Sequence, residues 1–319
     1  MSNLVIRQMS QEDLPDADRI NRVAFGTFFG LETPSAFRGD GDVVAGRFAA
    51  NPEGAFVAEM DGLQVACGFV MDWGSVGILG PLTVDVTAWG RGIGRAMLDE
   101  MTGYMDSQGF ALQGLFTHPQ SATHIRLYEA YGFRMKRITA VMDRTVRPET
   151  EMPPTARLFS ELAASERPAV LDGCCSIAGS VYRGLDLTGE ILSIDRAGLG
   201  DTVLLGPDTA MTGFACCHQG SGSEAGSPQT LVKFAAVRPD ETGPAEFEAL
   251  FTACEAFAAL RGTNRLVAGT NTGRAECYEA MLAMGFRTWM NGIAMLKTAG
   301  DDRGDGYNVP GIYAIDDWR

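Results

Sequence analysis

Residues 84–98 read VDVTAWGRGIGRAML, and this stretch decides the fold of the first half of the chain. A β-branched run leads into three glycines, Gly90, Gly92 and Gly94, and from Ile93 the apolar residues recur at 93, 97, 101, 104 and 105. That spacing is typical of one face of a helix. A strand that ends in a glycine turn and opens a helix presents unpaired backbone N–H groups at the positive end of the helix dipole. The stretch therefore predicts a phosphate-binding turn.

Two common glycine motifs do not fit the stretch. A dinucleotide fingerprint needs a small residue three places after its second glycine, where this chain has Arg95 or Met97. A P-loop needs a lysine after its last glycine, and no lysine precedes Lys136. The alternative to a phosphate site is that the glycines only permit close helix–strand packing.

The surrounding pattern predicts an α/β layer domain in the order β-α-(α)-β-β-β-α-β-α-β. Ser10 and Asp13 fit a capping box at the first helix. A hairpin turns at Asp61-Gly62, a strand covers 76–86, and a helix runs from Ile93 to near residue 109. The strand 111–118, the helix 121–133 and the strand 134–144 complete the half.

The second half repeats this pattern weakly. Residues 145–157 carry three prolines and no periodicity, which predicts a linker near 146–156. Beyond it, 202–217 match 55–71 in shape, with an aspartate in the turn, and 278–297 echo 128–144. We therefore expect two copies of one fold, with domains at 1–148 and 149–298 and a C-terminal tail at 299–319.

Two motifs carry a family resemblance. Residues 89–94 resemble the Gln/Arg-x-x-Gly-x-Gly/Ala signature of the GNAT family, the acyl-CoA-dependent N-acetyltransferases, and 121–133 resemble its Asn-x-x-Ala-x-x-Leu-Tyr-x-x-x-Gly-Phe helix. The resemblance spans roughly residues 4–146, and the degenerate second copy makes the chain look like a tandem GNAT protein. It implies two domains, each with a mixed, mostly antiparallel twisted sheet flanked by helices. It also implies acetyl transfer from acetyl-CoA to a primary amine, by direct attack through a tetrahedral intermediate.

The resemblance also assigns residues. The backbone of Val84 and Val86, on either side of Asp85, would bind the pantetheine arm, and Tyr128 would be the general acid. Three positions depart from the family pattern: Trp89 replaces Gln or Arg, Ser121 replaces Asn, and His124 replaces Ala. The expected cofactor-binding residues are Val84, Asp85, Val86, Arg91, Gly92, Ile93, Gly94, Arg95, Ala96 and Ser121.

The general base and the acceptor site are less defined. Pro81 stands where many family members have an acidic base, which leaves His118, Asp72 and Glu59 as candidates, with His118 favoured. Phe25, Phe28 and Phe29 predict an aromatic wall at the acceptor site, although three phenylalanines this close are as often core. The wall and the acidic composition favour a small hydrophobic or cationic amine.

The second copy lacks the expected machinery. Its loop reads DETGPAEFEAL over residues 240–250, where a proline and several acids would repel pyrophosphate, and Met281 replaces the tyrosine. We expect this half to be structural, walling the acceptor pocket.

Composition sets the remaining bounds. A formal net charge of −14 argues against a nucleic-acid partner, and no apolar run is long enough to span a membrane. Seven cysteines without CxxC spacing predict reduced thiols in a cytoplasmic protein and no metal site. We expect no signal peptide, because the first residues lack the basic, apolar and small-residue pattern of a leader. The alternatives to the N-acetyltransferase are a non-catalytic acyl-CoA sensor or scaffold and a transferase of another acyl group. The oligomeric state stays open between a monomer and a homodimer.

Overall fold

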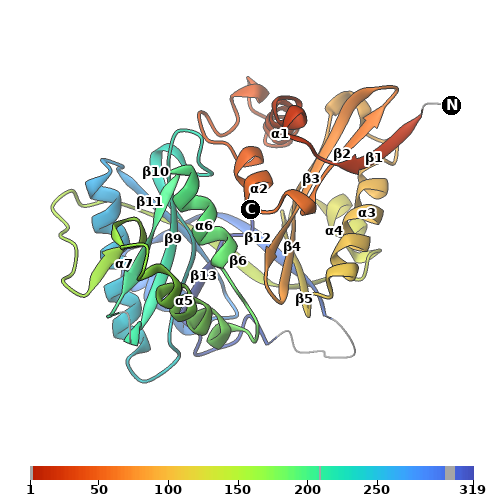
Figure 1. Cartoon of the computed structure of the whole chain (residues 1–319). Coiled ribbons are helices and arrows are strands. Elements are labelled where there is room, and N and C mark those ends of the chain that lie inside the picture. The colour runs from red at the N-terminus through yellow and green to blue at the C-terminus, as the bar shows by residue number, and fades with distance from the viewer. Residues whose placement is uncertain (1–2, 208–209, 299–305) are drawn as a thin grey trace.

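The computed structural model describes residues 3–207, 210–298 and 306–319. The first half forms the right-hand lobe in Figure 1 and the second half the left-hand lobe. No helix in the described ranges is both long and apolar enough to cross a membrane. All seven cysteines are free thiols, as predicted.

The first half follows the predicted order of elements. Short 3-10 helices accompany it at Gln11–Asp13, Pro34–Ala36, Pro52–Gly54 and Val86–Ala88 (η1 to η4). The capping box of Ser10 and Asp13 is present at η1. The longer elements are β1 Leu4–Gln8, α1 Leu14–Phe28, α2 Val44–Ala50, β2 Ala55–Met60, β3 Leu63–Trp73, β4 Val76–Val84, α3 Ile93–Gln108, β5 Leu112–Thr117, α4 Ala122–Glu129 and β6 Arg134–Thr145.

The second half repeats the same order, which the sequence echo predicted. Its aspartate turn includes Asp208, which lies outside the described residues. The elements are β7 Ala156–Leu158, η5 Phe159–Glu161, α5 Arg167–Val181, α6 Thr188–Ala197, β8 Gly200–Leu205, β9 Gly213–Gly220, β10 Gly226–Val237, α7 Gly243–Leu260, β11 Arg265–Asn271, α8 Ala275–Ala283 and β12 Arg287–Thr298, followed by β13 Ala314–Asp316.

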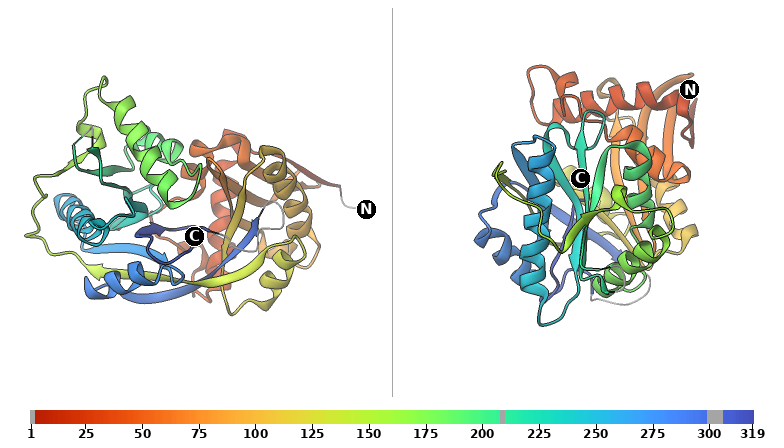
Figure 2. Two further views of the ribbon diagram at one scale, coloured as in Figure 1. Left: turned by 90° about the horizontal axis from the view of Figure 1, so that it is seen from below. Right: turned by 60° about the vertical axis from the view of Figure 1, so that its left-hand side comes forward.

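The strands of both halves form one continuous sheet. Its order is β1-β2-β3-β4-β5-β12-β6-β11-β10-β9-β8-β7, with β13 paired to β10. The last strand of each half therefore lies beside the other half: β12 pairs with β5, and β6 pairs with β11. Figure 2 shows β6 and β12 running from one lobe to the other. The order of elements repeats after β6, but the sheet does not divide between the two halves.

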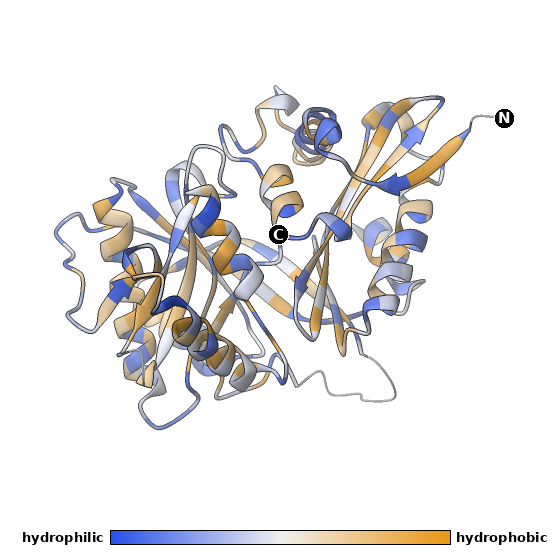
Figure 3. Ribbon diagram, in the orientation of Figure 1, coloured by the Kyte–Doolittle hydropathy of each residue, from blue (hydrophilic) through white to orange (hydrophobic). Residues whose placement is uncertain are grey.

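Helices cover both faces of each lobe. In the first half, α1 and α2 pack around Cys67 and Phe69 on one face, and α3 packs around Val70 and Leu79 on the other. The strands of both lobes are largely apolar along their length, as Figure 3 shows. This layering leaves the carboxyl ends of β4 and β5 between the two helix layers.

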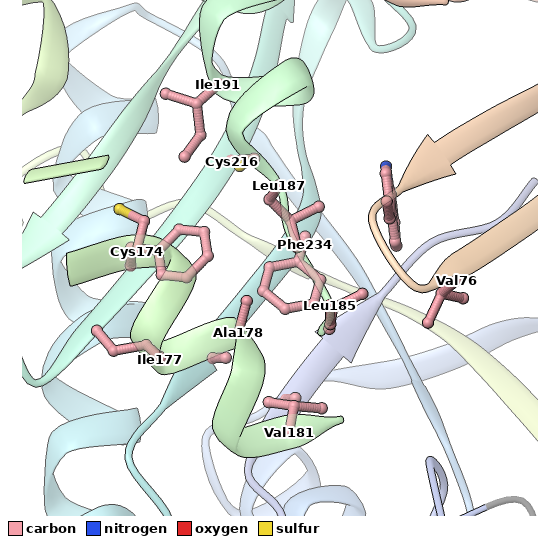
Figure 4. Packing of buried hydrophobic residues seen from close by; sticks show 14 of the residues in the cluster. Val76, Cys174, Ile177, Ala178, Val181, Leu185, Leu187, Ile191, Cys216 and Phe234 are labelled. Atoms are coloured by element: carbon pink, nitrogen blue, oxygen red, sulfur yellow. The ribbon is translucent and has the colours of Figure 1, made fainter. Parts of the chain in front are cut away.

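A shared core joins the two halves on the α5 side of the sheet. Val76 lies in the same cluster as Leu185 and Phe234 (Figure 4). The ring of Trp73 contacts that of Phe234 edge-on at 5.8 Å between centroids. Since these residues are 0–1% exposed, their burial removes apolar area from water across the junction and stabilises it.

Candidate active site

An opening between β4 and β5 defines the candidate site. The two strands pair in parallel only from Val76 opposite Leu112 to Leu79 opposite Leu115. A bulge in β4 follows, because Gly80 and Pro81 together face one residue of β3. Within the described residues β4 continues to Val84 without a partner on that side. A bulge of this kind bends the strand away and leaves backbone groups available for a ligand.

The backbone groups that face the opening belong to Leu82 and Val84. The N–H of Asp85 donates to the carbonyl of Val65 at 2.8 Å, so Asp85 faces β3. Because successive residues of a strand turn their backbone groups to opposite sides, those of Val84 and Leu82 point into the opening. Leu82 was missed in the sequence, although simple alternation counted back from Val84 would have found it.

The prediction that the strand reaches Val86 is wrong. The strand ends at Val84, and Val86 begins the 3-10 helix η4. The cause is the side chain of Asp85, which accepts from the backbone N–H of Thr87 at 3.0 Å and from its hydroxyl at 2.7 Å, and so turns the chain. The same carboxylate pairs with Arg19 at 3.1 Å, so it is held against α1 and not toward the opening.

The glycine loop follows directly and starts α3. Gly90 and Gly92 have φ values of 75° and 80°, in the region that only glycine adopts easily, and Gly92 is the N-cap of α3. A Cβ at either position would meet nothing within 4 Å, so the loop surface is open to a ligand. Ile93, 2% exposed, anchors the loop in the core.

The set of available amides is smaller than predicted. The N–H groups of both Arg95 and Ala96 donate to the carbonyl of Gly92 at 3.1 Å, so they already belong to the helix. Amides of the first helical residues have no acceptor within a helix, so those of Ile93 and Gly94 stay available at the start of α3. The side chains of Arg91 and Arg95 are exposed beside them. Trp89 joins loop and strand, since its indole N–H donates to the carbonyl of Val84 at 2.8 Å.

Tyr128 lies on α4, which packs beside the start of α3. Burial raises the pKa of its phenol to about 12. Tyr131, a residue missed in the sequence, fixes this helix, because its hydroxyl donates to the carbonyl of Arg95 at 2.9 Å and contacts the carboxylate of Asp99 at 2.6 Å. Ser121 is the N-cap of α4 and accepts from the N–H of His124 at 3.5 Å.

The predicted acceptor residues come together with the predicted base. The ring of Phe28 lies 5.3 Å from that of His118 and 5.6 Å from that of His124, and Phe29 meets His118 edge-on at 5.1 Å. His124 precedes Tyr128 by four residues, so both lie on one face of α4. Phe25 joins the same group through Phe29 and Phe37, at 6.3 Å and 5.4 Å. We call Phe25, Phe28, Phe29, Phe37 and His118 the aromatic wall.

The wall changes the protonation of His118. Burial, with the positive charges of His124 and Arg319 adding to it, lowers the pKa of the imidazole to about 4. Its Nδ1 is buried without a hydrogen-bond partner in the described part of the chain. His118 is therefore neutral at physiological pH.

The other two candidate bases lie elsewhere. Glu59 accepts from Nε of Arg7 at 3.0 Å on the outer pair of strands, β1 and β2. Asp72 caps the tip of the β3–β4 hairpin through the N–H of Gly74 at 2.8 Å. It pairs in register with Gly77, seven residues before Val84, or roughly 23 Å along the strand.

In the second half the matching opening is filled by the chain itself. β10 and β11 pair only from Gln229 to Leu231, and the following β10 residues Phe234 to Ala236 pair with β13. The loop before α7 is also occupied, because Asp240 accepts from the N–H of Thr242 at 2.9 Å. Met281 is fully buried in the core. These contacts agree with the interpretation of this half as structural.

Buried charges connect the second half to the opening in the first. Arg47 donates to the carbonyl of Gly80 in the β4 bulge at 2.6 Å and to the carboxylate of Glu224 at 2.6 Å, and also contacts the carbonyl of Arg319. Lys233 donates to the same carboxylate at 2.6 Å. No local pattern in the sequence marks Arg47, because its partners Gly80, Glu224 and Arg319 lie more than 30 residues away along the chain.

Comparisons with known proteins agree with this geometry. Residues 51–135 match the family model "Acetyltransferase (GNAT) domain". A search of curated proteins found no match. A candidate acetyltransferase from Pyrococcus horikoshii has a similar structure, with a TM-score of 0.67 and 13% identity over 99% of this chain and 95% of the other.

Two further solved structures share the fold. A GCN5-related N-acetyltransferase from Sphaerobacter thermophilus gives a TM-score of 0.59 at 15% identity over 92% of this chain and 95% of its own. A tandem GNAT protein from the clavulanic acid biosynthesis pathway gives 0.58 at 14% identity over 95% of this chain and 100% of its own. Residues 51–135 therefore match the GNAT acetyltransferase domain, and the fold of the chain is that of a tandem GNAT protein.

Proposed function

We propose that the first half transfers an acetyl group from acetyl-CoA to a small primary amine. The observation that carries this proposal is the opening between β4 and β5, which ends where the glycine loop begins α3. GNAT domains use acyl-CoA as a cosubstrate, and an opened strand next to a helix N-terminus suits an amide-bearing arm followed by phosphates. In this proposal the second half walls the acceptor pocket and does not bind a second cofactor.

The cofactor would lie along β4. The pantetheine amides would pair with the backbone of Val84 and Leu82, and the pyrophosphate would accept from the amides of Ile93 and Gly94. Arg91 and Arg95 add positive charge at the same helix end. Ser121 and Asp85 would then position α4 and η4, which they cap, and would not contact the cofactor.

The amine must reach the thioester unprotonated, although alkylamines have a pKa near ~10.4. With a pKa of about 4, His118 is too weak a base to deprotonate a free ammonium. The amine therefore enters from its unprotonated fraction, with solvent taking up the first proton. His118 can accept the second proton from the nitrogen of the tetrahedral adduct, which is more acidic once the C–N bond has formed. The N–H of Val84 faces the opening and can stabilise the oxyanion of this adduct.

Tyr128 then meets the departing sulfur. The pKa of its phenol is about 12, whereas a thiol has a pKa near 8.5, so complete proton transfer would cost about 5 kcal/mol. Tyr128 therefore stabilises the thiolate by donating a hydrogen bond, and solvent supplies the proton after C–S cleavage.

A second candidate function is acyl-CoA binding without turnover. Pro81 favours it, because the position beside the opening carries no ionisable side chain. Transfer of a different acyl group is a variant of the first candidate.

One experiment separates these functions. Release of the CoA thiol from acetyl-CoA is measured against a panel of primary amines for wild type, Tyr128→Phe and the control Tyr278→Phe, which lies in α8 of the second half. We expect amine-dependent release with kcat at least ~10-fold lower in Tyr128→Phe, an unchanged KM for acetyl-CoA, and no effect of the control. Binding of acetyl-CoA without release for any amine would contradict the transferase and favour the binding protein.

A further inference from the structure

The loop between α1 and α2, residues 37–41, is held rigidly at the rim of the aromatic wall. Arg22 donates to the carbonyls of Phe37 and Gly39 at 2.8 Å and to that of Gly41 at 2.6 Å. The other side of the loop meets the β9–β10 hairpin, where the N–H of Asp42 donates to the carbonyl of Ser223 at 2.9 Å. Side chains on this loop are therefore preorganised by both halves.

This loop holds Arg38 in an unfavourable backbone conformation. Its φ is +65°, which costs a non-glycine residue on the order of 1 kcal/mol. The guanidinium carbon lies 5.6 Å from the Phe37 ring, and Nη1 donates to the carbonyl of Glu224 at 3.1 Å. Phe37 in turn stacks on Phe29 at 5.6 Å. The strained residue thus presents a cation at one end of the aromatic wall.

The carboxylates around Arg38 are already engaged. The carboxylate of Glu224 accepts from Arg47 and Lys233, each at 2.6 Å, and that of Asp317 accepts from Arg319 at 2.8 Å. Among the described residues Arg38 has a carbonyl and no carboxylate as its hydrogen-bond partner. The nearby carboxylate of Glu190 is paired with His218 at 2.7 Å.

Arg38 therefore has no counter-ion of its own beside the wall. The nearby carboxylates of Glu224 and Asp317 are already paired with Arg47, Lys233 and Arg319. Burial, together with the charge of Arg319, lowers the pKa of Arg38 to about 10, as expected for a cation without its own counter-ion. An unbalanced buried charge is costly, and an anion that binds there removes the cost.

We propose that the acceptor amine carries a carboxylate bound by Arg38 and an apolar group that lies on the aromatic wall, as in an amino acid with an aromatic or large aliphatic side chain. Arginine is suited to this task because its guanidinium binds a carboxylate in bidentate fashion. The proposal rests on the proposed transferase function, and it replaces the hydrophobic or cationic amine that the composition favoured.

The test uses two pairs of ligands that differ by one carboxylate. N-acetylphenylalanine and N-acetylphenethylamine are titrated calorimetrically into the CoA-loaded protein, and phenylalanine and phenethylamine are compared as acceptors in the thiol-release assay. The variants are Arg38→Gln, Arg38→Lys and the control Arg261→Gln, whose guanidinium stacks on Phe257 in α7 at 5.3 Å.

We expect wild type to bind N-acetylphenylalanine at least ~10-fold more tightly than its decarboxylated analogue, because a charge-assisted hydrogen bond is lost in the analogue. Arg38→Gln removes this preference, Arg38→Lys keeps part of it, and Arg261→Gln leaves it intact. Equal binding of both ligands, binding of neither, or a preference that survives in Arg38→Gln overturns the proposal. The release assay answers separately whether the protein is a transferase, since turnover of phenethylamine alone supports that function while contradicting this acceptor.

Discussion

Burial moves two side chains of the site, Tyr128 and His118, toward their neutral forms. For Tyr128 this keeps the phenol protonated, with a pKa of about 12, so it remains a hydrogen-bond donor throughout the physiological range. For His118 it keeps the imidazole unprotonated, with a pKa of about 4. Both shifts follow from the same desolvation, because a charged ring is poorly solvated among aromatic side chains.

The shift of His118 predicts a pH dependence of stability. Its folded pKa of about 4 lies below the ordinary value of 6.5, so as the pH falls below 6.5 the unfolded chain takes up a proton that the folded chain does not. Stability is therefore fully present above pH 6.5 and is lost progressively down to pH 4. Between pH 7 and pH 5 this residue should remove about 2 kcal/mol from the free energy of unfolding.

The measurement is urea unfolding of wild type and His118→Phe at pH 7, 6 and 5. Carboxylates titrate alike in both proteins, so the difference between the two free energies of unfolding isolates the imidazole. The difference should shift in favour of His118→Phe as the pH is lowered. Two parallel curves would show that the imidazole is not desolvated in the folded protein.

A substitution at Gly92 can separate an effect on CoA binding from an effect of backbone strain on stability. Gly92 and Gly109 are the two caps of α3, with φ values of 80° and 72°, and an added Cβ would meet nothing within 4 Å at either. Gly92→Ala and Gly109→Ala should each cost about 1 kcal/mol of stability through strain alone. Only Gly92→Ala should also weaken CoA binding, by at least ~10-fold, because its methyl group enters the space of the phosphate. Calorimetric titration with CoA decides this, and an equal loss of affinity in both variants would place the phosphate elsewhere.

At the scale of single elements, β4 and β10 show how one pattern gives two outcomes. Both strands pair with a parallel neighbour over a few residues and then separate from it. The first opening stays available, whereas in the second β13 pairs with Phe234 to Ala236. Among the described residues the second half therefore has no matching opening, because a strand of its own chain pairs with β10 there.

Arg274 holds β13 in that position. It is fully buried, and its Nη1 donates to the carboxylate of Asp316 and to the carbonyl of Ala314, each at 3.0 Å. Arg274→Leu should lower the free energy of unfolding by about 3 kcal/mol or more, because it leaves the carboxyl group buried without its partner. Arg274→Leu combined with Asp316→Leu should be less destabilised than Arg274→Leu alone. Chemical denaturation of the three proteins tests this, and additive losses would mean that the two side chains are not coupled.

Local elements were predictable from the sequence where turns and helix ends carry distinctive residues. The Asp61-Gly62 hairpin, the capping box at Ser10 and the helix that ends before Gly109 all form as expected. The predicted strand does not reach Val86, because the Asp85 side chain accepts a hydrogen bond from the N–H of Thr87. A hydrophobicity pattern does not contain this competition between side chain and backbone.

The candidate site was predictable only in part, for the same reason. The glycine loop, Tyr128 and the phenylalanines stand in recognisable local patterns. Arg38 and Arg47 gain their roles from partners in the other half, and no periodicity in one sequence encodes such pairings. The exchange of β6 and β12 escaped prediction likewise, since either strand has the same alternation in both arrangements.

At the scale of the whole molecule, the exchange makes the two halves one unit. β12 supplies the neighbour of β5 that completes the first half, and β6 supplies the neighbour of β11 that completes the second. The buried charges of Arg47, Glu224 and Lys233 and the shared core around Trp73 and Phe234 cross the same junction. Neither half can lose its structure without exposing strand edges and apolar surface of the other.

We therefore expect a single cooperative transition on heating. Calorimetric and van't Hoff enthalpies should agree, although two copies of a domain would ordinarily unfold in two steps. A chain of residues 1–148 should not fold alone, because without β12 it exposes an edge of β5 and most of β6, which favours aggregation. Co-expression with residues 149–319 should restore a soluble complex in which β12 and β6 exchange as in the intact chain. Two resolved transitions, or a folded monomer of residues 1–148, would mean that the exchanged strands contribute little and that the first half builds its site unaided.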